Sequence, residues 1–234
     1  MGSEMCIRDR EMDVVFLMDR FGYAKTVDVS VYERNKEAAD TENRYILTCK
    51  NTDKICIFTN KGQMHLLKVL DLPYGKFRDK GIPIDNLSNY NSSEENFIYI
   101  INLGAIIHSR LLFGTKTAML KMVDGSEFDV AKRTTAATKL NEDDELLIVH
   151  SMTGEETVVM QSEKEMFLRI EASTIPEKKK GAVGVRGMKL NAGDALSNIY
   201  VLDGESEQTV EVKGKEVVLN RLRVGNRDTK GTKR

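Results

Sequence analysis

Lysine and arginine residues collect in the polar segments that separate the apolar runs of this chain. Such cations can hold phosphate groups, because duplex DNA carries about one negative charge per 1.7 Å of helix axis and needs spaced positive charges opposite it. The candidate phosphate-binding residues are Lys76, Arg78, Lys80, Lys132, Arg133, Lys178, Lys179, Lys180, Arg186, Arg227, Lys230 and Lys233. The bland alternative is that these are charged, solvated surface loops.

Three of the basic segments repeat a Lys-Gly pair, at Lys80-Gly81, Lys180-Gly181 and Lys230-Gly231. A glycine has no Cβ, so its backbone N–H could approach a phosphate closely. Contacts of this kind position a duplex without reading its sequence. The recurrence therefore leaves a phosphate-binding role and simple solvation about equally supported by the residues alone.

The total charge gives no reason to expect a polyanion partner, so the distribution of charge must carry the argument. The chain has 35 Lys and Arg against 36 Asp and Glu, a formal net charge of -1. Acidic stretches balance the basic loops; they are residues 37–42, 94–95, 142–145 and 203–207. We expect a polarised molecule with a near-neutral sum.

Residues that could make or break bonds are scattered. His65, His108 and His150 lie far apart and lack metal-ligand partners at suitable spacing. The three cysteines include no Cys-x-x-Cys, which predicts no disulfide framework and a reducing cytoplasm. Residues 143–145 lack the pattern of a calcium loop and are expected to form a solvated turn. We therefore expect no catalytic residue, metal or cofactor in this chain.

Five stretches share one layout, in which an apolar run, a turn, a second apolar run and a polar loop follow each other. They are residues 14–32, 54–87, 110–128, 157–175 and 208–224. Two β-prone runs around such a turn predict a hairpin, which needs further strands to bury its apolar face. Those strands are expected at residues 45–48, 82–87, 136–140 with 145–149, and 183–190 with 195–201. Four strands repeated at roughly fifty residues are typical of propeller blades.

The expected fold is all-β and propeller-like, with about five four-stranded blades and an incomplete last one. Residues 1–11 fit no later pattern and are expected to be a leader foreign to the domain, and residues 12–234 to form one domain. The blades are expected near residues 12–53, 54–109, 110–156, 157–207 and 208–234.

Some segments are expected to carry little structure or only surface polarity. Residues 33–43 have helix-forming composition but no apolar face, so a solvated loop or single turn is predicted. The polar tract at 88–95 is expected to be a surface loop, and residues 227–234 a frayed basic tail. Strand residues Lys25, Lys121 and Arg169 are predicted to face outward. No apolar run reaches about 18 residues, so no membrane span is expected.

Several of these segments resemble a known family. The stretch IFTNKGQMHLLKVLDLP at 57–73, followed by KGIPIDNL at 80–87, is similar to one blade of the C-terminal domain of bacterial type IIA topoisomerase A subunits. KLNEDDELLIV at 139–149 and KKKGAVGVRGMKLNAGDAL at 178–196 are similar to the return halves of later blades. The resemblance covers roughly residues 12–233.

The resemblance implies a β-pinwheel whose outer rim binds and bends double-stranded DNA independently of sequence. It implies an accessory role in an ATP-dependent DNA topoisomerase, where the partners are the A subunit's catalytic domains together with an ATPase B subunit. It also implies a cytoplasmic, nucleoid-associated protein. The alternative is a propeller that serves as a protein-interaction platform without binding DNA.

The chain departs from the family in two respects. Gyrase A subunits carry a Gln-Arg-Arg-Gly-Gly-Lys-Gly box in the first blade's loop, whereas residues 33–42 here are acidic and contain no glycine. This departure places the chain nearer topoisomerase IV. The catalytic tyrosine region of the family is absent, so the chain is expected to be a fragment without cleavage chemistry of its own.

Overall fold

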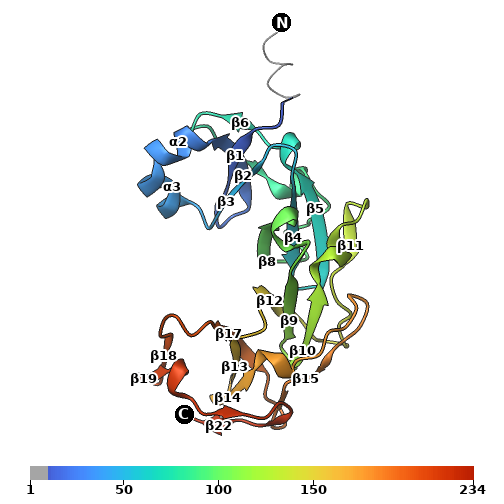
Figure 1. Cartoon of the computed structure of the whole chain (residues 1–234), viewed down its shortest axis with the longest axis vertical. Helices are drawn as coiled ribbons and strands as arrows, with labels where there is room; N and C mark the ends of the chain where they lie inside the picture. The colour runs from blue at the N-terminus through green and yellow to red at the C-terminus, as the bar shows by residue number, and fades with distance from the viewer. Residues whose placement is uncertain (1–9) are drawn as a thin grey trace, which may run out of the picture. The chain divides into compact units, whose positions relative to one another are not determined.

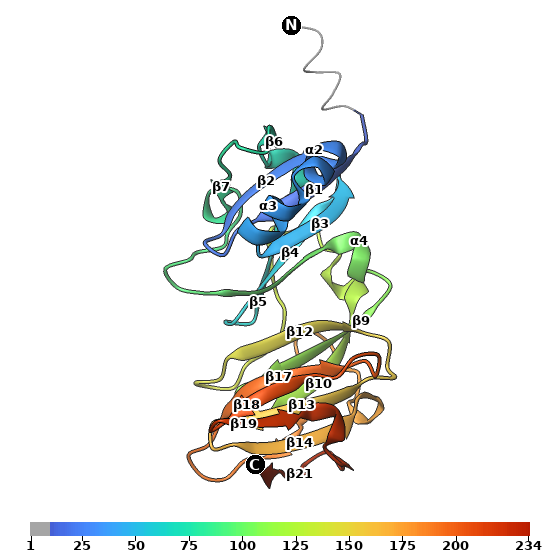
Figure 2. The same cartoon turned by 90° about the vertical axis from the view of Figure 1, so that its left-hand side faces the viewer.

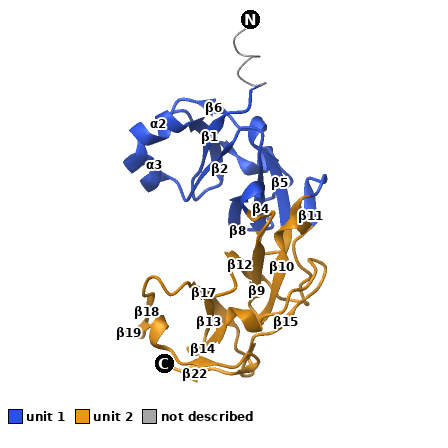
Figure 3. Ribbon diagram, viewed as in Figure 1, with its two compact units in different colours: residues 1–58, 64–105, 130–135 blue, residues 59–63, 106–129, 136–234 orange. Residues whose placement is uncertain are grey.

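The computed structural model describes residues 10–234, drawn in Figure 1 and, turned by 90°, in Figure 2. Residues 1–9 of the expected leader, which include Cys6, lie outside the described residues. The described chain forms two compact units, coloured in Figure 3. Among the described residues, unit 1 comprises residues 10–58, 64–105 and 130–135, and unit 2 comprises residues 59–63, 106–129 and 136–234.

Strands dominate the described residues, and they form four sheets of four or five strands. The first sheet has the order β3 (Tyr45–Lys50), β1 (Asp13–Met18), β2 (Tyr23–Asp28), β6 (Tyr74–Gly75), with β7 (Ile82–Pro83) also on β2. The second has the order β11 (Thr134–Ala136), β5 (Gln63–Lys68), β4 (Lys54–Thr59), β8 (Phe97–Asn102).

The other two large sheets repeat this arrangement. The third has the order β12 (Leu146–Met152), β9 (Arg110–Thr115), β10 (Met119–Asp124), β15 (Val185–Arg186). The fourth has the order β17 (Leu196–Leu202), β13 (Thr157–Ser162), β14 (Met166–Glu171), β20 (Val224–Gly225), with β22 (Thr232–Lys233) on β14. Two small sheets pair β16 (Met188–Lys189) with β21 (Thr229–Lys230) and β18 (Thr209–Val212) with β19 (Lys215–Val218).

All five predicted hairpins are confirmed: β1–β2, β4–β5, β9–β10, β13–β14 and β18–β19. Each turn contains a residue with positive φ, as tight hairpin turns require. These residues are Gly22, Gly62, Ala118, Glu165 and Gly214. The fifth hairpin forms only a two-stranded sheet, which confirms the expected incomplete last blade.

Each large sheet includes at least one strand from a later part of the chain than its own hairpin. β6 and β7 follow the second hairpin but pair with β2 of the first, and β11 follows the third hairpin but pairs with β5 of the second. In the same way β15 joins β10, and β20 and β22 join β14. In the first four hairpins the free edge of the second strand is thereby covered by a later stretch of the chain. A sheet is therefore not a contiguous stretch of sequence.

The expected loop at 33–43 is wrong, because the structure forms two short helices there, α2 (Val29–Arg34) and α3 (Lys36–Glu42). The Asp28 side chain caps α2 by accepting the Ser30 N–H. Ala39 is fully buried against the first sheet, and Val29 and Val31 pack on the same cluster. The apolar face was missed because it begins before residue 33.

The C-terminal residues are ordered in strands, contrary to the expectation of a frayed tail. Residues 227–234 are not frayed, because β21 pairs with β16 and β22 pairs with β14. The turns at 141–144 and 191–194 share one hydrogen bond: the backbone N–H of the aspartate, Asp144 or Asp194, donates to the carbonyl of the residue three positions earlier. Residue 144 is buried, so its turn is not simply solvated.

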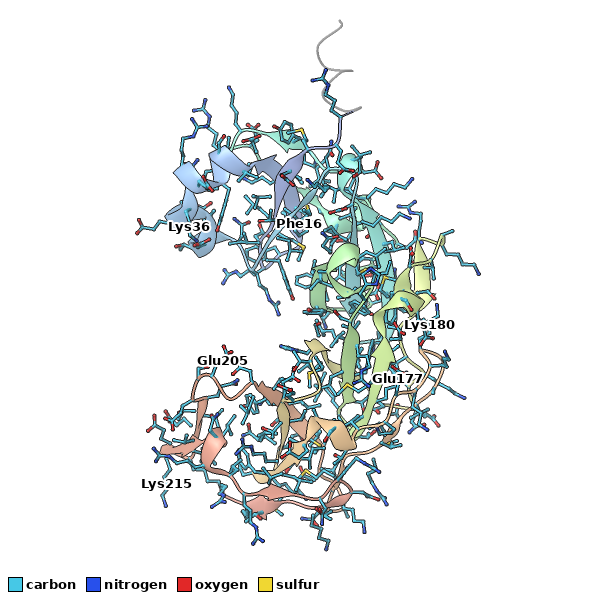
Figure 4. All side chains as sticks on the ribbon, viewed as in Figure 1. Phe16, Lys36, Glu177, Lys180, Glu205 and Lys215 are labelled. Carbon is cyan, nitrogen blue, oxygen red and sulfur yellow. The ribbon has the colours of Figure 1, made fainter. Side chains whose placement is uncertain are left out.

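Apolar side chains fill a core in each unit. Unit 1 buries Phe16, labelled in Figure 4, with Ile55 and Ile57. Unit 2 buries Met160 and Met188. Cys49 and Cys56 are also buried, and burial raises the pKa of each thiol to about 12, as expected for small hydrophobic residues. A further short helix, α4 (Leu103–Ile106), follows β8.

Candidate nucleic-acid interface

In the first sheet, two short segments pair with β2, and a loop connects them. The chain runs parallel to β2 as β6, with Thr26 opposite Tyr74, and comes back antiparallel as β7, with Ala24 opposite Ile82. We call residues 76–81, between these two pairings, the β2 loop. It lies at the outer edge of its sheet because no strand beyond it pairs with β2.

The same excursion occurs on two more hairpins. On β10, a parallel bridge joins Met122 to Glu177, and β15 then returns antiparallel; residues 178–184 are the β10 loop. On β14, β20 runs parallel and β22 antiparallel; residues 226–231 are the β14 loop. Figure 4 labels Glu177 and Lys180 on the segment beside β10. Three repeats thus place a loop at the same position of their own sheet.

Most of the sequence-predicted cations lie on these loops. The β2 loop carries Lys76, Arg78 and Lys80, the β10 loop carries Lys178, Lys179 and Lys180, and the β14 loop carries Arg227 and Lys230. Lys132 and Arg133 instead directly precede β11, where the second sheet has no excursion. Arg186 lies on β15 and Lys233 on β22.

Four of the predicted cations already serve the fold. The Arg133 guanidinium donates to the Leu87 carbonyl at 3.0 Å, and the Lys180 ammonium to the Glu127 carbonyl at 3.1 Å. Arg227 donates to the carbonyl of Arg186 at 2.9 Å. Arg186 itself forms an ion pair with Asp228. That hydrogen bond lowers the pKa of the Asp228 carboxyl, so much of the Arg186 charge is neutralised locally.

The remaining predicted cations are exposed, and their side chains form no such contacts within the protein. Within residues 10–234, no hydrogen bond or ion pair is formed by the side chains of the following residues: Lys76, Arg78, Lys80, Lys132, Lys178, Lys179, Lys230 and Lys233. An unpaired lysine keeps its full charge for an external anion. These eight residues are the strongest candidates for contact with a phosphate backbone.

The β10 loop is held from inside by Lys121, which contradicts its predicted outward position. The side chain is buried, and its ammonium donates to the carbonyls of Lys179 at 3.0 Å, Lys180 at 3.2 Å and Ala182 at 2.6 Å. Three acceptors satisfy all three ammonium protons. Burial lowers the pKa of Lys121 to about 8, although Glu127 acts in the opposite direction.

The β2 loop has a counterpart in Lys25. Its ammonium donates to the carbonyls of Phe77 and Asp79 and lies 5.0 Å from the centroid of the Phe77 ring. Lys25 is only half-buried. Lys25 and Lys121 each stand three positions after the positive-φ residue of their hairpin, at Gly22 and Ala118. Gly22 marks the first turn in the sequence, but Ala118 gives no such mark, so the inward position of Lys121 could not be read from the sequence.

The equivalent position of the second sheet is His65, which is buried with a carboxylate. His65 Nε2 lies 2.9 Å from Glu95 and Nδ1 lies 2.8 Å from the Thr134 hydroxyl. Glu95 also accepts the Asn91 N–H, and Tyr90 donates to the Glu95 carbonyl. The tract at 88–95 is therefore partly buried, and Glu95 is not the surface acid that the sequence suggested.

The glycines of the basic loops have a packing role. A Cβ on Gly81 would lie 2.7 Å from the Ala24 carbonyl oxygen, and one on Gly231 would lie 2.8 Å from that of Phe167. In the β10 loop the matching glycine is Gly184, 2.6 Å from the Leu120 carbonyl oxygen, and not Gly181. The close approach is thus between loop and strand. The Lys-Gly pairs do not align in space as their sequences do.

Exposed aromatic residues of unit 1 were not among the predicted site residues. Phe21, at the β1–β2 turn, is 68% exposed, and Tyr23 and Tyr74 are also exposed. The Asp19 carboxylate accepts the N–H groups of Phe21 and Tyr23, so the turn is well ordered. The Arg20 guanidinium lies 4.7 Å from the Phe21 ring centroid. Large exposed aromatic side chains often mark contact surfaces.

Metal clusters and membrane-crossing helices are two features that would point to other functions. Among residues 10–234, no group of three or more His, Cys, Asp or Glu side chains could hold a metal ion. No helix in the same part of the chain has the length and apolar composition needed to cross a membrane.

Comparison with known proteins gives consistent matches. Residues 109–151 and 156–203 match the family described as the DNA gyrase C-terminal domain, a β-propeller. The DNA gyrase A subunit of Staphylococcus epidermidis is 30% identical over 95% of this chain, and that of Lawsonia intracellularis is 28% identical over 94%. This chain is therefore similar to the C-terminal domain of DNA gyrase A subunits. It spans 27% and 29% of those two relatives, less than a third of their length.

Solved structures agree with the family on the fold. The C-terminal domain of DNA topoisomerase IV matches with a TM-score of 0.84 at 22% identity, over 96% of this chain and 73% of that one. The Escherichia coli ParC C-terminal domain matches with a TM-score of 0.76 at 15% identity, over 95% and 94%. The β-pinwheel expected from the sequence is therefore confirmed.

Proposed function

We propose that this domain binds and bends duplex DNA and presents it to the catalytic domains of a type II DNA topoisomerase. The observation that carries the proposal is the repeated edge loop, which displays unpaired cations in the β2, β10 and β14 positions. In the parent enzyme the partners would be the A subunit's catalytic domains together with an ATPase B subunit. The acidic α2–α3 segment, in place of a glycine-rich box, favours a topoisomerase IV-like role.

The chemistry of the loops suits a phosphate backbone and not base edges. Lysines dominate the unpaired set, and they act as mobile point charges that attract phosphate without fixing a bidentate geometry. Such contacts position a duplex, and any preference then comes from how easily the DNA bends. We therefore propose sequence-independent binding that responds to duplex shape.

Titration of the chain against a labelled duplex of about 40 base pairs tests this, with fluorescence anisotropy at several salt concentrations. Each phosphate contact should contribute about 0.9 to the slope of log affinity against log salt. Lys178→Gln with Lys179→Gln should weaken binding to all sequences alike and lower that slope. Lys213→Gln with Lys215→Gln, on the β18–β19 hairpin, removes the same charge away from the loops and should change little.

Two results would count against DNA binding: no complex at low salt, or a complex that salt does not weaken.

A protein-interaction platform is the second candidate, and the exposed Phe21, Tyr23 and Tyr74 favour it, since aromatic residues are enriched in protein interfaces. Charge reversal at Lys178, Lys179 and Lys180 to Glu separates the two. A protein platform keeps its partner in that variant, whereas a DNA binder loses the duplex.

A further inference from the structure

The β14 loop borders a half-open cavity of about 370 Å³. Four of its lining residues are cationic, namely Arg169, Arg223, Lys230 and Arg234, and none of the lining side chains is acidic. The remaining lining residues come from β14, β20 and the loop itself, together with Leu222 just before β20 and Thr232 on β22. A concave surface lined by charges of one sign concentrates the field and attracts the opposite ion.

This loop lacks the internal lysine of the other two. Three positions after Glu165, the positive-φ residue of the β13–β14 turn, stands Leu168, where the other hairpins have Lys25 and Lys121. In those hairpins the lysine ammonium occupies the space under the loop and binds its carbonyls. Leu168 packs into the unit 2 core and offers no such group. The β14 loop therefore arches over an unfilled, positively charged space.

One cation of the cavity is already oriented. Arg169 Nη1 donates to the carbonyls of Asn220 at 2.7 Å and Leu222 at 3.1 Å, and Nε donates to the Thr157 hydroxyl at 3.0 Å. No carboxylate pairs with Arg169, Arg223 or Lys230 within residues 10–234. A guanidinium fixed in this way retains Nη2 for a ligand and loses little side-chain entropy when it binds.

We propose that this cavity binds a phosphate-bearing anion, with Arg169 as the fixed anchor and Arg223 and Lys230 closing on it. Guanidinium and ammonium groups together are the usual partners of phosphate oxygens. A volume of about 370 Å³ is larger than one phosphate needs and admits a pyrophosphate group. Two sources share this chemistry, a DNA backbone phosphate and a free phosphorylated small molecule. The site goes beyond the proposed function, because a free anion can fill the cavity whether or not a duplex binds.

Calorimetric titration of the whole chain with inorganic pyrophosphate at low salt tests the site. We expect saturable binding that weakens about tenfold or more in Arg223→Gln with Lys230→Gln. The matched control, Lys178→Gln with Lys179→Gln on the β10 loop, removes the same charge and should leave pyrophosphate binding unchanged. Thermal unfolding of both variants shows whether they fold. Absent binding, or equal weakening in the two folded variants, would overturn the site.

Duplex titration with and without saturating pyrophosphate, at matched ionic strength, distinguishes the two sources. Competition supports a cavity that takes a backbone phosphate, and undiminished duplex binding supports one that takes a free anion. Failure of the duplex to bind while pyrophosphate binds refutes the proposed function but keeps the cavity site. Duplex binding without cavity-specific pyrophosphate binding refutes the cavity site but keeps the proposed function.

Discussion

The β10 loop and the β2 loop occupy the same place in their sheets, yet they are anchored differently. Lys121 is 1% exposed and donates to three loop carbonyls, whereas Lys25 is half-buried and donates to two. Water can replace the bonds of Lys25 but cannot easily reach those of Lys121. One topological device can therefore serve either a firmly held basic loop or a more yielding one, according to the burial of its lysine.

Removal of the Lys121 ammonium should give the largest effect. Lys121→Met keeps much of the side-chain volume but leaves three carbonyls without their donor, and an unsatisfied buried polar group is costly. We expect the free energy of unfolding to fall by about 3 kcal/mol, measured by chemical denaturation. Lys68→Met, at an exposed strand position, is the control and should change stability by less than about 0.5 kcal/mol. Equal effects in the two variants would contradict the anchoring role.

The next largest effect should come from the glycine that lets the β10 loop approach its strand. Gly184 has φ +105°, and an added Cβ would meet the Leu120 carbonyl oxygen at 2.6 Å. We expect Gly184→Ala to cost about 2 kcal/mol of unfolding free energy. Gly181, in the same loop, has no heavy atom within 4 Å of an added Cβ. A thermal melt of Gly181→Ala should match the parent protein, and a comparable loss there would refute the packing explanation.

The pH dependence of stability should expose the buried charge directly. The pKa of Lys121 is about 8 in the folded chain, against 10.5 for an unperturbed lysine. Between these two values the Lys121 site binds more protons in the unfolded chain than in the folded one, so its contribution to stability rises with pH, by at most about 1.4 kcal/mol per pH unit. The buried thiols of Cys49 and Cys56 act in the opposite direction above about pH 9, so the contribution is read as the difference between the parent chain and Lys121→Met in denaturation curves from about pH 7 to pH 10.5. The slope should shrink in Lys121→Met and persist in Lys25→Met.

The smallest effect should follow from loss of the half-buried anchor. Lys25→Met frees the carbonyls of Phe77 and Asp79, but water can bind them, so we expect a loss of about 1 kcal/mol. Hydrogen exchange of amides in residues 76–81 should accelerate more than that in residues 178–184. A loss as large as that in Lys121→Met would erase the distinction between the two loops.

Much of the fold followed from local sequence patterns. Gly22, Gly62 and Gly214 mark three turns because glycine accepts positive φ without strain, and alternating apolar runs around them predict hairpins. The exposed loop lysines were likewise visible as charge between strands. The α2–α3 segment was not, because its burial depends on Ala39 contacting a sheet that the local sequence does not describe.

The site was only partly predictable, since identical residue types took different roles. Lys178 and Lys180 are two residues apart, yet Lys180 donates to the Glu127 carbonyl, whereas no hydrogen bond or ion pair of the Lys178 side chain is found in the described chain. Lys68 and Lys121 both lie in strands, yet one faces solvent and the other is buried. Side-chain partners that are distant in sequence make these distinctions, and no local pattern encodes them.

The amino-acid sequence by itself determined the hairpins, their repeat and the basic segments between them, because turn chemistry and alternation act over a few residues. The tertiary structure alone decided which hairpin receives each return strand, and hence where the basic loops lie. It also decided that Lys121 is an anchor and that the space over Leu168 stays open. Those outcomes depend on pairing between segments tens of residues apart, where edge hydrogen bonds and burial, and not local preference, set the free energy.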